Sequence, residues 1–367
     1  MEELPIGLIV AIAGFAAGMV FGATVKITNF CTMGSISDMI LMEDKGRLRA
    51  YMLTIAVAII GTQVLHGAEL IDVGEATFQN PKFNWLGYVL GGLLFGFGMT
   101  MSSGCASRTV VLIGGGNLKS VVVFLVMAIV AFTTNQGLLG VFRANVIDPT
   151  AIDLTAMGLE TQGIPAILTA ITGIEGATTS VIVAAIIAGA LLVFCFKDAE
   201  FRRPNADLAS GLILGALVVA GWWITGVLGF DDFEPTPLRS FSFVGPTANS
   251  LMYIMTFTGS TINFGIAAIG GIIFGSFLVA MFTKTFAFQT FQGSRDMIVH
   301  LIGAVLMGFG GTIAAGCTLG QGVTGMSTLA LGSLLTLASI FVGGIYGIRY
   351  LEEESFGGAL AAMFGRD

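Results

Sequence analysis

The chain has 367 residues, of which 55% are hydrophobic and only 11% are charged, and its formal net charge is -7. Typical soluble domains carry about 25% charged residues, so the composition excludes an ordinary soluble fold. The mean hydropathy of +0.90 and the 52 glycines instead favour closely packed membrane helices. The four cysteines form no CxxC pair, and His66 and His300 lie apart from them, so we predict no disulfide framework, metal site or cofactor.

Nine apolar segments are long enough to cross about 30 Å of hydrocarbon as helices. Their approximate limits are 5–24, 48–66, 85–103, 118–140, 178–196, 208–228, 262–283, 297–315 and 331–348. Four shorter or broken apolar stretches remain, at 31–42, 105–116, 288–296 and 317–329. We predict that these are re-entrant helices or loops, which membranes tolerate only where protein or a water-filled path satisfies the backbone. The predicted fold is therefore an all-α polytopic membrane protein.

Basic residues predict the orientation of these segments. With the N-terminus outside the cell and the C-terminus in the cytoplasm, only Lys82, Arg143 and Arg239 of the 16 basic residues lie on the outer side. Such an asymmetry follows the positive-inside rule. We therefore expect a multi-pass protein of a bacterial inner membrane, with a periplasmic N-terminus.

One segment of the sequence occurs twice. The ten residues from Gly96 to Cys105 return from Gly308 to Cys317 at an offset of 212, with six identities. A weaker similarity, at an offset of 258, links the segment around Cys31 to the segment around Gln289, which has no cysteine. These similarities predict a pseudo-symmetric repeat: residues 1–140 form the first copy, 141–261 a connecting region with two spans, and 262–367 the second copy. The two Gly-Cys turns would approach the membrane centre from opposite faces.

Three cysteines lie at the breaks between a span and a short segment. Glycine lets the chain turn sharply there, and the helix that follows presents free N–H groups to an anion. A thiol adds a polarisable sulfur, which suits a sulfur-containing anion. The predicted substrate-binding residues are Cys31, Cys105 and Cys317, with their neighbours Gly104, Gly316, Thr32, Ser107 and Thr318. Cys195 lies inside a regular span and is interpreted as a buried apolar residue.

Charged residues near these turns allow two interpretations. Arg108, three residues after Cys105, either attracts the anion or fixes the orientation of the chain. We include it among the candidate site residues. Asp38 and Asp296 are interpreted as structural, as helix caps or as partners of Lys45 or Arg295.

Four separated motifs now identify a resemblance that extends along nearly the whole chain. FCTMGSISDM, GGLLFGFGMTMSSGC, GPTAN and MGFGGTIAAGC followed by TLGQG resemble the YeeE/YedE family of thiosulfate transporters. The resemblance implies nine transmembrane helices and several short ones in an hourglass shape. It also implies that Cys31, Cys105 and Cys317 pass thiosulfate inward through transient thiol contacts. The sequence Cys105-Ala106-Ser107-Arg108 departs from the family, which commonly has Thr and Gly after the residue that follows this cysteine.

The function expected from this resemblance is thiosulfate import for sulfur assimilation, with a TusA-like sulfur carrier as a further partner. The alternatives are transport of sulfide, sulfite, a persulfide or a selenium compound, and a membrane sulfurtransferase with Cys317 as nucleophile. We expect a transporter rather than an enzyme, because no general base or cationic cradle lies near Cys317 in the sequence. No P-loop or nucleic-acid-binding motif is evident.

Overall fold

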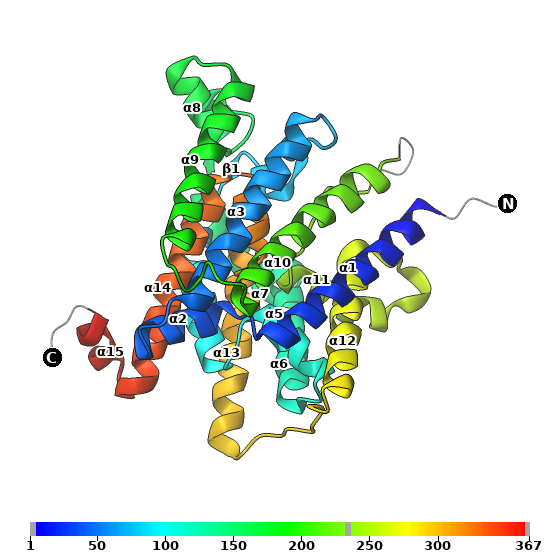
Figure 1. The fold of residues 1–367 in the computed structure, drawn as a ribbon, viewed down its shortest axis with the longest axis vertical. Helices are drawn as coiled ribbons and strands as arrows, with labels where there is room; N and C mark the ends of the chain where they lie inside the picture. The colour runs from blue at the N-terminus through cyan, green and yellow to red at the C-terminus, as the bar shows by residue number, and fades with distance from the viewer. Residues whose placement is uncertain (1–4, 232–235, 364–367) are drawn as a thin grey trace.

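The computed structural model describes residues 5–231 and 236–363, and this part of the chain is almost entirely helical. It contains nine helical segments long and apolar enough to cross a membrane. The long helices are α1 (Ile6–Thr28), α3 (Gly46–Gly67), α4 (Trp85–Met101), α6 (Leu118–Gln136), α9 (Gly176–Phe196), α10 (Ala206–Trp223), α12 (Phe264–Phe282), α13 (Ser294–Ile313) and α14 (Leu331–Glu353). Each overlaps a predicted span, which confirms the polytopic all-α fold (Figure 1).

Short elements connect these helices. They are α2 (Thr32–Leu41), α5 (Ala106–Gly114), α7 (Leu138–Phe142), α8 (Ile164–Thr172), α11 (Val244–Met255), α15 (Phe356–Met363), the π-helical segments η3 (Arg143–Ile147), η6 (Ile224–Leu228) and η8 (Gly320–Gly325), and several single 3-10 turns. Strands β1 (Lys82–Phe83) and β2 (Ile152–Asp153) form one short antiparallel pair. The helices therefore carry nearly all of the fold.

Three of the four predicted re-entrant segments are short helices. Segments 31–42 and 105–116 contain α2 and α5, and segment 317–329 contains η8. In the fourth, 288–296, the chain from 285 to 293 is an irregular loop, which is the other of the two predicted forms, and α13 begins at Ser294. This loop meets the start of α6, where the Leu118 N–H donates to the Gln289 carbonyl at 2.9 Å. The contact gives this loop carbonyl a hydrogen-bond partner, which an N–H group of the same helix would otherwise have to supply.

The loops fall on two faces, because successive crossing helices alternate in direction. The cation-rich face carries the loops 29–45, 102–117, 197–205 and 283–293, and the opposite face carries 68–84, 137–175, 229–231, 236–263 and 314–330. Hydrogen bonds support this division, since Leu118 meets Gln289 on the first face and Ile164 meets Leu329, at 2.9 Å, on the second. Residues 1–4 and 364–367, which bear on the predicted placement of the termini, lie outside the described residues.

Glycines allow the long helices to approach closely. A Cβ atom on Gly18 or Gly22 of α1 would overlap the backbone of α12, and one on Gly271 or Gly275 of α12 would overlap the backbone of α1. The contact is therefore made by small residues from both sides. In a bilayer, where lipid is as apolar as leucine, such close packing replaces the hydrophobic effect as the force that joins helices.

Candidate functional site

The two Gly-Cys turns have the same backbone geometry. Ser103 and Ala315 are both left-handed, with φ of 55°. The following Gly104 and Gly316 donate their N–H groups to carbonyls five residues earlier, at 2.9 and 2.8 Å. These are Schellman-type helix ends, which stop α4 and α13 and turn the chain back. The sequence similarity between the two segments thus corresponds to one repeated structural device.

Each of the three cysteines begins a short helical or turned segment. Cys31 is the N-cap of α2, and its Sγ accepts a hydrogen bond from the Gly34 N–H at 3.5 Å. The Sγ of Cys317 likewise accepts from the Gly320 N–H at 3.3 Å. Cys105 is the N-cap of α5, and its Sγ lies 3.2 Å from Ser107 Oγ. The sulfurs therefore lie where free N–H groups gather and where an anion is favoured.

The three cysteines converge at the centre of the protein. The side chains of Cys31 and Cys105 contact each other, the ring of Phe30, next to Cys31, lies 6.2 Å from the ring of Tyr51, and the three cysteines belong to one buried cluster. Tyr51, on α3, donates its hydroxyl hydrogen to the Thr318 carbonyl at 2.6 Å. All three cysteines are buried, at 8%, 1% and 0% exposure in chain order. Sequence analysis missed Tyr51, because a single tyrosine in a span carries no motif.

Polar atoms beside the cysteines are buried but unpaired. Within the described residues, Thr32 Oγ1, Thr318 Oγ1 and Arg108 NH1 have no hydrogen-bond partner. A buried polar group without a partner costs free energy, so such atoms indicate a place where another group binds. Two of them, Thr32 Oγ1 and Thr318 Oγ1, are hydroxyls directly after a cysteine. They are donors available to an anion.

Arg108 lies on α5, in the segment 102–117 of the cation-rich face. Its NH2 donates to Asn29 Oδ1 at 3.0 Å, and its charge is close enough to interact with Lys26. Two cations that repel each other stay together at least cost when an anion neutralises them. This placement favours the anion-attracting interpretation of Arg108.

Other candidate residues have structural roles. Asp38 pairs with Arg47 at 3.3 Å, and Asp296 pairs with Lys119 at 2.6 Å, so both aspartates are structural but their partners differ from the predicted ones. Cys195 donates its thiol hydrogen to the Arg49 carbonyl at 3.3 Å from within the regular helix α9. It takes no part in the central cluster.

A cavity of about 540 Å³, which we call the arginine cavity, opens from the opposite face toward Cys317. Its polar lining includes Arg143, Arg239, Ser242 and Asn249, and it reaches Gly316, the residue before Cys317. Sequence analysis placed the two arginines outside the cell but assigned them no site. Their loops are far apart in the sequence, so only the fold brings them together.

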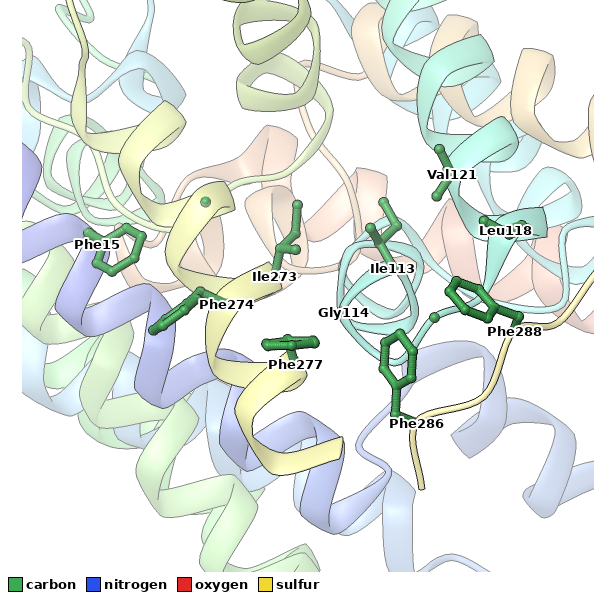
Figure 2. Close-up of a pocket in the computed structure, with 12 residues that line it drawn as sticks. Phe15, Ile113, Gly114, Leu118, Val121, Ile273, Phe274, Phe277, Phe286 and Phe288 are labelled. Carbon is green, nitrogen blue, oxygen red and sulfur yellow. The ribbon is translucent and has the colours of Figure 1, made fainter. Parts of the chain in front are cut away.

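A second cavity, of about 560 Å³, has a different character (Figure 2). Phe15 of α1, Phe274 and Phe277 of α12, and Ile113 of α5 line it together with aromatic residues of the loop after α12. This lining is almost wholly apolar and offers no donor to a charged solute. It is therefore unsuited to an anion.

Comparisons with known proteins identify the family of this chain. The model of a family described as "Sulphur transport" matches residues 27–346. The chain is 25% identical to the thiosulfate transporter TsuA of Escherichia coli (strain K12) over 85% of its own length and 86% of the relative's. It is 26% identical to the thiosulfate transporter TsuA of Spirochaeta thermophila over 89% of its own length and 94% of the relative's. With buried cysteines at repeated helix ends and a match over most of its length, the chain belongs to this sulphur transport family, the YeeE/YedE family.

Proposed function

We propose that the protein imports thiosulfate across the inner membrane of a bacterium for sulfur assimilation, through Cys317, Cys105 and Cys31 in that order. The observation that carries the proposal is the convergence of three buried thiols between the arginine cavity and the cation-rich face. The names of the two relatives support thiosulfate as the substrate.

The arginine cavity serves as the entrance in this proposal. Arg143 and Arg239 attract the dianion from the periplasm, although the net charge of the chain is -7. A partly enclosed cavity strengthens such attraction, because fewer water molecules screen the charges. Gly316 lines this cavity and Cys317 directly follows it, so the captured anion meets a thiol next.

Transfer through the centre is noncovalent in this proposal. Each thiol donates its S–H to the anion, and the anion moves from Cys317 to Cys105 and Cys31 without making or breaking a sulfur–sulfur bond. Thr32 and Thr318 offer their unpaired hydroxyls to the same path. Since donors on successive turns replace one another, the anion is never left without partners.

The exit lies toward Arg108 and Lys26 on the cation-rich face, which we place in the cytoplasm. A negatively charged solute leaving the cysteines meets these two cations. A TusA-like carrier that accepts the sulfur would dock on this face. The predicted periplasmic N-terminus and cytoplasmic C-terminus belong to the same arrangement.

Growth on thiosulfate tests the proposal. A bacterium without its own sulfate and thiosulfate uptake receives the gene, or its Cys317→Ala or Cys195→Ala variant, with thiosulfate as sole sulfur source. We expect growth with the wild type and Cys195→Ala but not with Cys317→Ala, at equal amounts of protein in the membrane. Growth with all three would refute the role of Cys317, and growth with none would shift the substrate to another sulfur or selenium compound.

Two further measurements separate the alternatives. Unlabelled sulfide, sulfite and selenium compounds are tested as competitors of labelled thiosulfate uptake, and the true substrate competes most strongly. A sulfurtransferase would instead leave a persulfide on Cys317, detected by mass spectrometry of the detergent-purified protein after exposure to thiosulfate.

A further inference from the structure

Helix packing reveals a more extensive internal repeat than the sequence does. Helix α1 packs on α12 as α10 packs on α3, and α4 packs on α14 as α13 packs on α6. The short elements follow the same rule, since α2 packs on α3 as α11 packs on α12, and α5 packs on α12 as η8 packs on α3. These contacts pair α1–α6, in order, with α10–α14, and η8 takes the place of α5. The second copy then begins at Ala206, earlier than the boundary at residue 262.

This pairing identifies the counterpart of Cys31. Cys31 directly precedes α2, and Ser242 lies two residues before α11, which is the partner of α2. An offset of 211 aligns Cys31 with Ser242 and Gly34 with Gly245, one residue less than the 212 that separates Cys105 from Cys317. The weaker sequence similarity pointed instead to Gln289, but that residue lies in the loop between α12 and α13 and occupies no equivalent position.

Local contacts around the two cysteine turns agree with the pairing. The backbone N–H of Thr32, which follows Cys31, interacts with the Cys105 sulfur. In the second copy the N–H of Phe243, which follows Ser242, interacts with the Cys317 sulfur. The two turns therefore meet in the same way in each copy.

Ser242 and Cys317 approach a common point. A Cβ atom on Gly320 would lie 2.6 Å from Ser242 Oγ and 3.7 Å from Cys317 Sγ. Ser242 also lines the arginine cavity and is partly exposed to it. Its hydroxyl makes no hydrogen bond to any other residue in the described ranges, 5–231 and 236–363. A free hydroxyl beside a thiol at the inner end of a cavity is placed to bind a solute.

We propose that Ser242 is a substrate-binding residue and, with Cys317, forms the first binding site for the anion. Thiosulfate has a polarisable terminal sulfur and a group of harder oxygen atoms. The Cys317 thiol suits the sulfur and the Ser242 hydroxyl suits an oxygen. The pair would thus favour a sulfur oxyanion over sulfide, which has no oxygen. This inference rests on the proposed function, and it adds an explanation of how the first binding site would select a sulfur oxyanion.

Uptake of labelled thiosulfate tests the role of the hydroxyl. Ser242→Ala should raise the KM at least about tenfold, which corresponds to one hydrogen bond to a charged group. Ser250→Ala on α11 is the matched control, since that hydroxyl already donates to the Pro246 carbonyl at 2.8 Å, and its KM should stay at the wild-type value. An unchanged KM for Ser242→Ala, in a wild type that takes up thiosulfate, would overturn the inference alone.

A second test does not require transport. In Ser242→Cys, mild oxidation should join the new cysteine to Cys317, with the loss of two free thiols, because both side chains approach Gly320. A membrane-impermeant anionic thiosulfonate reagent should label Ser242→Cys from the periplasmic side, and thiosulfate should slow the labelling. Absence of both the cross-link and the labelling would refute the placement of Ser242. Labelling without protection, together with no uptake by the wild type, would instead refute thiosulfate as the substrate.

Discussion

Replacing Tyr51 by phenylalanine tests the contact that joins α3 to the Cys317 turn. The tyrosine hydroxyl donates to the Thr318 carbonyl at 2.6 Å, and both residues are nearly inaccessible, at 1% and 0% exposure. Tyr51→Phe keeps the ring but leaves the carbonyl without that donor. An unsatisfied buried acceptor costs about 1–3 kcal/mol. We therefore expect the free energy of unfolding to fall by about this amount.

The lost contact should also affect transport. Thr318 directly follows Cys317, so a carbonyl that turns to find another donor moves the backbone that carries the thiol. The assay combines unfolding of the purified protein in detergent with uptake of labelled thiosulfate in cells. Tyr253→Phe on α11 serves as the control, because the Tyr253 hydroxyl has no hydrogen-bond partner among the described residues.

We expect lower stability and reduced uptake in Tyr51→Phe, and wild-type behaviour in Tyr253→Phe. Wild-type stability and uptake in Tyr51→Phe would show that the hydrogen bond neither fixes the turn nor holds Cys317 in place. Reduced stability with full uptake would confine Tyr51 to a structural role.

Three further changes give expected outcomes. Replacing Arg143 or Arg239 by glutamine should raise the KM for thiosulfate about twofold to fivefold, as expected for one partly exposed charge. Uptake at graded thiosulfate concentrations measures the KM, and an unchanged KM in both variants would exclude the two arginines from capture of the anion. Gly96→Val should destabilise the protein by about 1–3 kcal/mol, because its side chain would overlap the α14 backbone, and a wild-type unfolding midpoint would contradict this. Hydrogen bonds from the N–H groups of Glu200 and Phe201, together with the Arg49 guanidinium, lower the pKa of Asp198 in the folded protein. Its contribution to stability is therefore present above the unfolded pKa of 3.8 and is lost as pH falls through the lower, folded pKa. Asp198→Asn should flatten that part of the stability profile between pH 7 and pH 3, and an unaltered profile would refute the assignment.

The amino-acid sequence was sufficient for the membrane class and for the location of the spans. Apolar segments of about 20 residues must form helices in a bilayer, because no water is present to satisfy their backbone. The same reasoning located α2, α5 and the broken segment around Cys317. For 288–296 it left a helix and a loop both open, and this stretch, with Phe288 and Phe291, forms a loop up to residue 293. Composition alone does not distinguish a short buried helix from a loop whose backbone is satisfied by a neighbouring element.

The sequence also supplied the candidate cysteines, since repeated Gly-Cys turns remain visible when spacing is conserved between two copies of a segment. Tertiary structure decided which residues accompany them. Tyr51 lies on α3, Arg143 in the loop after α6, and Arg239 and Ser242 in the loop before α11, and nothing in their local sequence marks them. The counterpart of Cys31 was hidden for the same reason. The two copies have diverged in sequence, but their helices still pack in equivalent pairs, because close glycine contacts restrict how membrane helices can be arranged.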